Sequence, residues 1–239
     1  MLYLMSDVHA DIKSMKKMIN RIHFVPSRDC LIIIGDFIDG DTSSIELIKY
    51  MSKYIKMGAI KLIKGNHELF LEHYYNGCLD AKAWDLFGGK VSHQEFDDLS
   101  QIEKHQLVEF ISKLPHYMII DTPEFGEVVL THTGIDIDSI VHTDDGKINV
   151  VESIKEAIRS NEYKYLINMD IHNISSSYKK LLDKFIICGH VATQNLHEDG
   201  RSAVYKTPYY MDIDCGCAYR KRGGKLACYC VDNQKIYYV

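Results

Sequence analysis

Short apolar runs alternate with amphipathic stretches along the first quarter of the chain. The runs at 3–5, 30–34 and 60–63 are rich in aliphatic residues and stop abruptly at polar residues, which is typical of buried strands. Between them, apolar residues three and four positions apart predict helices over 12–23 and from about Thr42 to Ile55. The run at 30–34 has no alternating polar face, which indicates a sheet covered on both sides. The chain is therefore predicted to begin β-α-β-α-β.

The remaining residues mix helical and strand patterns. Residues 69–113 are mainly helical, with a Gly88-Gly89 break and a capping box at Ser100 and Glu103, and we expect them to form a helical insertion or lid. Residues 136–182 are polar and helix-prone. Strands are expected at 117–121, 128–131, 184–188, 209–215, 225–231 and 235–239, with a hairpin loop at 220–224. Residues 1–239 contain no repeat or linker and are predicted to form one α/β (α+β) domain, a β-sandwich of two mixed sheets flanked by helices.

The composition narrows the classes of partner. The net charge of -5 and the pI near 6.2 argue against an extended nucleic-acid or membrane surface, because both would need an excess of lysine and arginine. No apolar run approaches the roughly 20 residues that span a bilayer, and Met1 leads directly into the first strand without a signal-peptide pattern. We therefore expect a cytoplasmic protein, provided that no leader was removed.

The seven cysteines are an odd number in a chain expected to be cytoplasmic, so a disulfide framework is not expected. Two Cys-x-Cys pairs stand out, Cys215 with Cys217 and Cys228 with Cys230. If their strands were paired, four sulfurs would share one face and could bind zinc. The other interpretation is that these cysteines are small buried apolar residues.

Polar side chains follow five of the predicted strands at the point where each strand ends. Because the carboxyl ends of neighbouring strands meet at one edge of a sheet, these side chains could line a single crevice. Asp7 and His9 alone could be a satisfied turn pair, but the repetition indicates metal ligands. Six oxygen and nitrogen ligands suit two ions about 3.5–4 Å apart that share one carboxylate, for which Asp36 is the candidate. The set is Asp7, His9, Asp36, Asn66, His132 and His190.

The order of these motifs resembles the calcineurin-like metallophosphoesterases. The motifs are Asp-x-His at 7–9, Gly-Asp-x-x-Asp at 35–39, Gly-Asn-His-Glu at 65–68, His132 and Gly189-His190. Within that superfamily the chain is most similar to the phosphoprotein phosphatase branch, which includes small bacterial and phage Ser/Thr phosphatases and diadenosine tetraphosphatases. Gly189-His190 lacks the second histidine of the Gly-His-x-His form, and Asp212-Ile-Asp214-Cys-Gly216 is similar to the Ile-Asp-Thr-Gly strand of this branch.

The resemblance implies a calcineurin-like fold and a role for each site residue. Asp7, His9 and Asp36 would hold one divalent ion, and Asp36, Asn66, His132 and His190 would hold the other. Manganese is the first candidate, with iron or zinc as alternatives. His67 would be the general acid, with its imidazole oriented by Asp39. Alternatively, Asp39 stabilises the N-terminus of the following helix, and His67 only supports the ligands.

The chain departs from the phosphatase branch at its phosphate-binding arginines. Asp39 is followed by Gly40-Asp41 where that branch has arginine, and the segment 166–170 has no second arginine. The loss of both should weaken the binding of a phosphate monoester more than that of a diester. Basic residues of the loop at 220–224 could replace them. The candidates for substrate binding are Arg220, Lys221 and Arg222.

Three functions follow from these observations. The first is a dinuclear metal-dependent phosphomonoesterase, of the Ser/Thr protein phosphatase type, that uses a metal-bridging hydroxide. The alternative is a nucleotide phosphodiesterase or dinucleoside polyphosphate hydrolase, for which the missing arginines matter less. The third is a catalytically weak binding protein, against which the His67–Asp39 pair argues. The expected partners are a phosphorylated protein or a small phosphorylated or nucleotide substrate.

Overall fold

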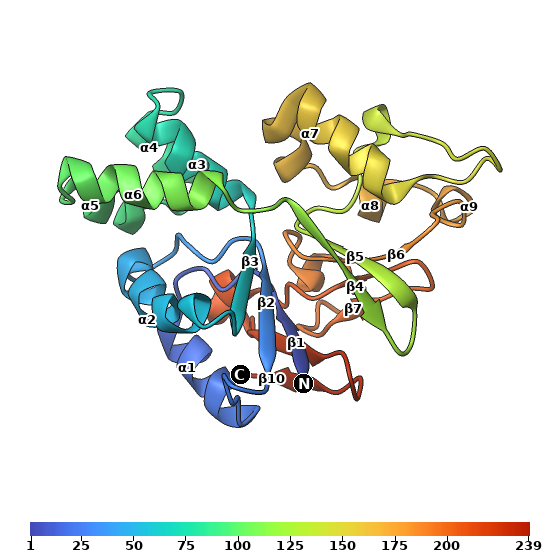
Figure 1. The fold of residues 1–239 in the computed structure, drawn as a ribbon, viewed down its shortest axis with the longest axis horizontal. Helices are drawn as coiled ribbons and strands as arrows, with labels where there is room; N and C mark the ends of the chain where they lie inside the picture. The colour runs from blue at the N-terminus through green and yellow to red at the C-terminus, as the bar shows by residue number, and fades with distance from the viewer.

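The computed structural model describes residues 1–239 and contains two five-stranded sheets. The first sheet has the strand order β10-β9-β1-β2-β3, and the second has the order β4-β5-β6-β8-β7. Each sheet combines parallel and antiparallel pairs. Helices lie on the outer sides of the sheets (Figure 1). The predicted α/β sandwich of two mixed sheets is therefore confirmed.

The strands of the first sheet are β1 (Leu2–Met5), β2 (Cys30–Ile34), β3 (Ile60–Ile63), β9 (Ala227–Cys230) and β10 (Ile236–Tyr238). Those of the second sheet are β4 (Tyr117–Thr122), β5 (Gly126–Thr131), β6 (Phe185–Cys188), β7 (Tyr205–Lys206) and β8 (Tyr210–Asp212). The helices are α1 (Ile12–Arg21), α2 (Ser44–Lys56), α3 (Asn66–Tyr75), α4 (Ala81–Leu86), α5 (Lys90–Asp97), α6 (Gln101–Ser112), α7 (Val150–Ile167), α8 (Asp170–Asn173) and α9 (Ser176–Lys179), with short 3-10 helices η1 (Ile137–Ser139), η2 (Thr193–Asn195) and η3 (Cys217–Arg222).

The strand β2 shows how the apolar runs build the core. Leu31 and Ile33 point to one face and pack in the cluster that includes α1 and α2. Ile32 and Ile34 point to the other face and pack between the two sheets, against residues of β5, β6 and β8. This alternation is the period of two of an extended strand. Both faces of the first sheet are therefore covered, as the absence of a polar face predicted.

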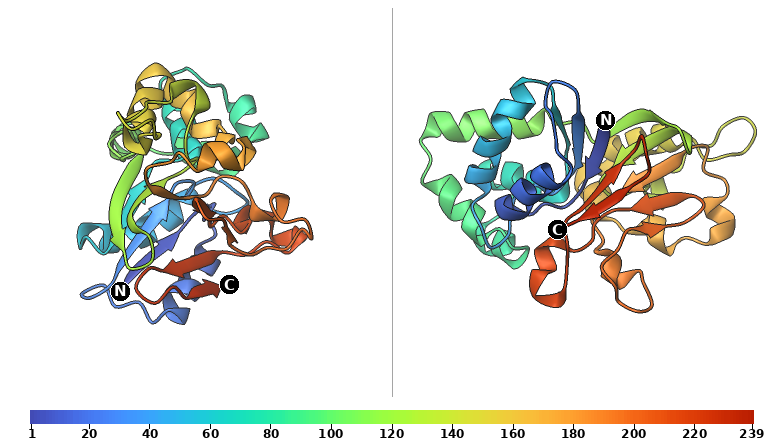
Figure 2. Two further views of the ribbon diagram at one scale, coloured as in Figure 1. Left: turned by 90° about the vertical axis from the view of Figure 1, so that its right-hand side faces the viewer. Right: turned by 90° about the horizontal axis from the view of Figure 1, so that it is seen from below.

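Two groups of helices stand above the sheets (Figure 1). The helices α3–α6 follow β3 and occupy the segment expected to be a helical insertion, and α6 begins with the predicted capping box at Ser100. The helix α7 packs on the outer face of the second sheet through residues such as Ile154 and Tyr165. Figure 2 shows the sheets from the side and from below, with the two helical groups at the same end of the molecule. None of the helices has the length and apolar character that crossing a bilayer requires.

The C-terminal prediction needs a correction. The strand expected over 209–215 is only three residues long, and residues 217–222 form η3 instead of a hairpin loop. The chain there crosses from β8 in the second sheet to β9 in the first, so the two Cys-x-Cys segments do not lie on paired strands. The cysteines Cys217, Cys228 and Cys230 are free and belong to the buried apolar core. The structure therefore favours the packing interpretation over a four-cysteine zinc site.

Candidate metal centre

The site lies where the polar ends of strands from both sheets meet. The strands β1, β2 and β3 run parallel, so Asp7, Asp36 and Asn66 leave the same edge of the first sheet. In the second sheet β5 and β6 also run parallel, and His132 and His190 follow their ends. Side chains separated by up to 183 positions in the sequence thus come together because each begins a loop at a strand end.

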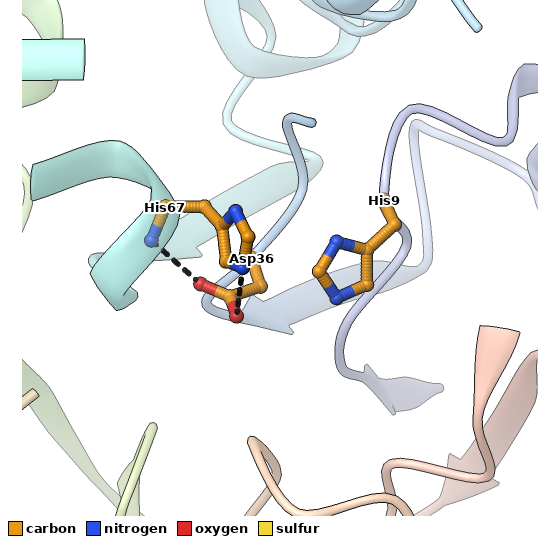
Figure 3. A group of neighbouring side chains, drawn as sticks. All are labelled: His9, Asp36 and His67. Carbon is orange, nitrogen blue, oxygen red and sulfur yellow. Dashed lines mark hydrogen bonds and ion pairs between the residues drawn. The ribbon is translucent and has the colours of Figure 1, made fainter. Parts of the chain in front are cut away.

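Two groups of ligand-type side chains share Asp36. His9, Asp36 and His67 have ligand atoms within 4.8 Å of one another, and so do Asp36, His132 and His190. Figure 3 shows the rings of His9 and His67 next to each other beside the Asp36 carboxylate, with dashed lines joining His67 to both carboxylate oxygens. The Oδ2 atom of Asp36 lies 3.7 Å from Nε2 of His67 and 3.2 Å from Nε2 of His132. A carboxylate common to both groups is what a bridging ligand requires.

The environment of His132 fits a cation. Its Nδ1 lies 3.1 Å from the carbonyl oxygen of Ile34, an acceptor, so this nitrogen carries a proton. Its Nε2 faces two further acceptors, Oδ1 of Asn66 at 2.9 Å and Oδ2 of Asp36 at 3.2 Å. A proton or a metal ion among these three atoms would satisfy all of them. Burial lowers the pKa of His132, but the Asp36 carboxylate outweighs burial and raises the pKa. The surroundings of this ring therefore stabilise a positive charge.

The other two histidines of the set, His9 and His190, are in surroundings that favour the neutral imidazole. Burial, reinforced by His67, lowers the pKa of His9 to about 4. Burial, reinforced by His132, lowers the pKa of His190 to about 3. Both rings are therefore neutral at neutral pH and offer a lone pair, which is the form that binds a metal.

Asp7 lies beside these groups and is nearly inaccessible to solvent. Its Oδ1 is 3.9 Å from Nε2 of His9, and its carboxylate accepts hydrogen bonds from the backbone N–H of His190 and from the hydroxyl of Ser6. Burial and the neighbouring carboxylates of Asp214 and Asp36 raise the pKa of Asp7. No lysine or arginine forms an ion pair with Asp7 or Asp36. Buried carboxylates without basic partners are costly, and divalent ions would offset that cost.

His67 and Asp39 form a separate pair beside the candidate metal ligands. The Nδ1 atom of His67 is 2.7 Å from Oδ2 of Asp39, and both side chains are buried. Burial lowers the pKa of His67, but the carboxylates of Asp36 and Asp39 outweigh it and raise the pKa to about 9. His67 is therefore held protonated, in contrast to His9 only 4.8 Å away between ring centres. Of these two adjacent imidazoles, one is protonated and one is neutral. The protonated ring suits an acid, and the neutral ring suits a metal ligand.

The backbone bends sharply at the residues of the site. Asp7, His9, Asp36, Asp39 and His190 all have positive φ angles, between 47° and 74°. The chain packs so tightly at the turn after β3 that Gly65 has no room for a side chain, since a Cβ there would overlap with the Asp36 carboxylate. The sharp bends turn consecutive polar side chains into the crevice instead of along the strand direction.

Two residues that the sequence reasoning did not assign to the site lie at its base. Glu68 is completely buried, and its carboxylate accepts hydrogen bonds from four backbone N–H groups of the turns after β2 and β3. Trp84, in α4, donates its indole N–H to Asp39 at 2.7 Å. Glu68 belongs to the Gly-Asn-His-Glu motif, and Trp84 is the only tryptophan. Both features draw attention to these residues, but neither predicts the groups with which their side chains form hydrogen bonds.

The contacts of Arg220 do not favour the predicted role in phosphate binding. All five N–H groups of its guanidinium already have protein partners: Nε bonds to Asp11 at 3.1 Å, Nη1 to the carbonyl oxygens of Gly224 and Val239, and Nη2 to Ser14 and Cys217. Arg220 therefore fastens the η3 segment to α1 and to the C-terminus. Lys221 and Arg222 are exposed and form no ion pair.

Residues 2–202 match the family described as calcineurin-like phosphoesterase, and this match covers most of the chain. The chain belongs to the calcineurin-like phosphoesterase family. Membership in this family implies a hydrolase that acts on phosphoester bonds with the help of divalent metal ions, and the two ligand groups around Asp36 fit such ions.

Relatives within this phosphoesterase family carry names that refer to dinucleoside polyphosphates. The chain is 30% identical over 134 residues to a symmetrical bis(5'-nucleosyl)-tetraphosphatase of Buchnera aphidicola, a match that covers 56% of this chain and 44% of the relative. It is also 30% identical over 149 residues to the asymmetrical bis(5'-nucleosyl)-tetraphosphatase PrpE of Bacillus subtilis, covering 57% of this chain and 59% of that one. The chain thus spans about half the length of these relatives.

Solved structures show that the family fold extends over the whole chain. A structure titled as a putative diadenosine tetraphosphatase has a TM-score of 0.60 and 14% identity, and the alignment covers 100% of this chain and 92% of that one. A Ser/Thr phosphatase of Saccharomyces cerevisiae with similarity to human PP5 has a TM-score of 0.56 and 14% identity, covering 100% of this chain and 78% of that one. At these identities the similarity shows the fold alone.

Proposed function

We propose that this phosphoesterase hydrolyses phosphoanhydride or phosphoester bonds of nucleotides, with dinucleoside polyphosphates as the preferred class. The single observation that carries a hydrolytic function is Asp36 shared between two ligand groups, with His67 held by Asp39 on one side of it. The names of the relatives support the nucleotide class. Support for a Ser/Thr protein phosphatase comes only from the fold of a distant structural neighbour.

The ligands would hold two divalent ions, one at Asp7, His9 and Asp36 and one at Asp36, Asn66, His132 and His190. When bound, the ions neutralise phosphate charge and lower the pKa of water so that hydroxide is available near neutral pH. The protein contributes the acid. Since the Nδ1 atom of His67 is fixed by Asp39, its Nε2 points toward Asp36, where it can donate a proton to the oxygen of the leaving group.

Aromatic side chains next to His67 favour a nucleotide leaving group. The group that receives a proton from His67 must leave past the residues that flank this imidazole. The ring of Phe70 packs against His67, with 5.4 Å between ring centres. Two partly exposed rings pack against Phe70 in turn, Phe87 at 5.0 Å and Tyr163 at 6.2 Å between ring centres. Phe87 is 51% exposed, which leaves a free ring face for a nucleobase. The chain lacks the two phosphate-binding arginines of the phosphatase branch, so recognition through the nucleoside becomes more important.

The proposal is tested by comparing four substrates with added manganese. Diadenosine tetraphosphate, p-nitrophenyl phosphate, bis-p-nitrophenyl phosphate and a phosphoserine peptide should be assayed in parallel, together with elemental analysis of the purified protein. We expect the highest kcat/KM for the dinucleotide and two divalent ions per chain. A higher kcat/KM for the phosphopeptide would reinstate the protein phosphatase, and an active protein with a single ion would refute the dinuclear site.

The nucleobase contact has a matched pair of variants. Phe87→Ala should raise the KM for diadenosine tetraphosphate about ten-fold, because stacking on one base contributes on the order of 1–3 kcal/mol. The KM for p-nitrophenyl phosphate should change less. Leu86→Ala is the control, because Leu86 is the adjacent residue and is 86% exposed. Equal effects of the two variants on the dinucleotide would contradict stacking on Phe87.

The role of His67 is tested through the leaving group. His67→Asn should slow hydrolysis of alkyl phosphate esters by roughly 10²–10⁴-fold, the usual contribution of a positioned proton donor. Esters of p-nitrophenol need less protonation and should slow less, while the metal content stays unchanged. If both ester types slow by the same factor, His67 is not the acid.

A further inference from the structure

Trp84, the only tryptophan of the chain, donates a hydrogen bond to Asp39, the carboxylate that orients His67. Trp84 lies in α4 and is completely buried. Its Nε1 is 2.7 Å from Oδ2 of Asp39, and the same oxygen is 2.7 Å from Nδ1 of His67. Gly89 packs against the flat face of this indole so closely that a Cβ at position 89 would overlap with it. The indole is therefore fixed from both its N–H edge and its face.

Asp39 depends on these two donors. The carboxylate is completely buried, forms no ion pair with lysine or arginine, and its second oxygen, Oδ1, has no hydrogen-bond partner. With Trp84 present, both donors meet on Oδ2 and the carboxylate has one orientation. Without the indole N–H, rotation of the carboxylate would exchange the two oxygens at little cost. An indole donates only and does not titrate, so the donor of this hydrogen bond does not change with pH.

The same helices hold the backbone around Asp39. The N–H of Gly40 donates to the carbonyl oxygen of Gly88 at 3.1 Å. The hydroxyl of Ser44, which accepts the N–H of Asp39, is 2.7 Å from the hydroxyl of Ser92. The segment from α4 to α5 thus contacts the Asp39 turn at side chain and backbone. These helices have no metal ligand of their own, yet they set the position of the carboxylate next to the acid.

We propose that Trp84 is a positioning residue for proton donation: it fixes Asp39, which in turn aims Nε2 of His67 at the leaving group. The proposal rests on the proposed function, because it assigns Trp84 a part in the step that His67 performs. It also gives the helical insertion a role in the chemistry itself. Trp84 does not contact substrate and acts only through Asp39 and His67.

The first test is a double-mutant cycle read through the leaving group. Trp84→Phe should lower kcat for alkyl phosphates about ten-fold, lower kcat for p-nitrophenyl phosphate about two-fold, and leave both KM values within two-fold. In an Asp39→Asn background the same change should have no further effect, because the residue through which Trp84 acts is already altered. Phe96→Leu is the control: Phe96 is a buried aromatic residue of α5 that, like Trp84, packs against Tyr74 but has no hydrogen bond to Asp39, so it reports the effect of disturbed packing alone.

The second test does not use activity. In protein free of paramagnetic ions, Trp84 gives the only indole N–H resonance in a ¹⁵N-correlated spectrum. We expect this resonance to exchange slowly with solvent and to shift on Asp39→Asn. If Trp84→Phe does not fold, 3-benzothienylalanine at position 84 keeps the shape of the indole without its N–H and replaces it in the cycle.

The outcomes separate this proposal from the proposed function. An active wild type whose Trp84→Phe variant slows both ester types equally, or slows as much as Phe96→Leu, would overturn the positioning role alone. An additive effect in the Asp39→Asn background, or an indole resonance that ignores Asp39→Asn, would also overturn it. A wild type without activity on any phosphoester would overturn the proposed function, and the positioning role with it.

Discussion

Replacing Glu68 by glutamine should loosen the base of the metal centre. The carboxylate of Glu68 accepts four backbone N–H groups: those of Asp36 and Gly65 bond to Oε2 at 2.9 and 2.8 Å, and those of Phe37 and Ile38 bond to Oε1 at 3.0 and 3.3 Å. One side chain thereby ties together the turns after β2 and β3. Both turns carry proposed metal ligands, Asp36 and Asn66, so the spacing of these side chains depends on Glu68.

The cost of Glu68→Gln follows from the pairing of these bonds. Each carboxylate oxygen serves two N–H groups, so an amide must turn its NH₂ toward two donors whichever way it is flipped. A buried donor left without an acceptor costs about 1–3 kcal/mol, which for two donors amounts to ~2–6 kcal/mol. Local relaxation reduces this, and we expect a loss of about 3 kcal/mol in the free energy of unfolding. With an m value of roughly 3 kcal/mol/M, the urea midpoint should fall by about 1 M.

Urea denaturation in the presence of a chelator measures this loss without contributions from bound metal. Glu109→Gln is the control, because Glu109 is exposed and pairs only with Lys113 on the same helix; its midpoint should not move measurably. Calorimetric titration with manganese should then show weaker binding to Glu68→Gln. A variant with the wild-type midpoint and wild-type manganese affinity would refute the reasoning that the four N–H groups need both oxygens of Glu68 as acceptors.

Three shorter predictions concern the rest of the chain. Asp36→Asn should remove more metal than Asp7→Asn in elemental analysis, because only Asp36 belongs to both ligand groups, and equal losses would contradict a bridging role. Arg220→Ala should lower the thermal midpoint while kcat/KM stays unchanged, since the guanidinium bonds only to the protein; a selective loss of kcat/KM would restore its role in substrate binding. The hydrogen bond from His116 lowers the pKa of Glu162 to about 2, so the stability that Glu162 contributes is present above its unfolded pKa of about 4.3 and is lost as pH falls toward 2. The stability difference between wild type and Glu162→Gln should therefore shrink over that window in urea titrations, and a constant difference would contradict the lowered pKa.

Much of the fold and the placement of the candidate ligands could be predicted because both depend on local patterns. An apolar run such as 30–34 has to be a strand, and the residue at which it stops has to leave the edge of the sheet. That logic, applied five times, assembles ligands from both sheets without any knowledge of their contacts. The resemblance then supplied the pairing of His67 with Asp39, which the structure places at hydrogen-bond distance.

The remaining features depend on contacts that no local pattern encodes. Arg220 sits in an exposed-looking basic stretch, but its position is decided by the C-terminal carbonyl group and by Asp11 in a distant turn. Trp84 reads as an ordinary apolar residue of a short helix, and its N–H finds a partner 45 positions away. The strand expected at 225–231 was assigned a neighbour from the wrong sheet because the crossing at η3 leaves no mark in the hydrophobic pattern. Long-range polar contacts of this kind become visible only once the topology is known.

The cluster of positive φ angles at the site has a consequence for the amount of protein in the cell. A residue other than glycine in the left-handed region costs on the order of 1–2 kcal/mol, somewhat less for aspartate, and five residues of the site adopt it. Divalent ions that bind only the folded chain would compensate for this cost in proportion to the logarithm of their free concentration. We expect the chain to be digested faster by protease in a chelator than with manganese, which limited proteolysis measures directly. A shortage of metal should therefore shorten the lifetime of the protein as well as lower its activity. The abundance of the protein should then follow the supply of the ions.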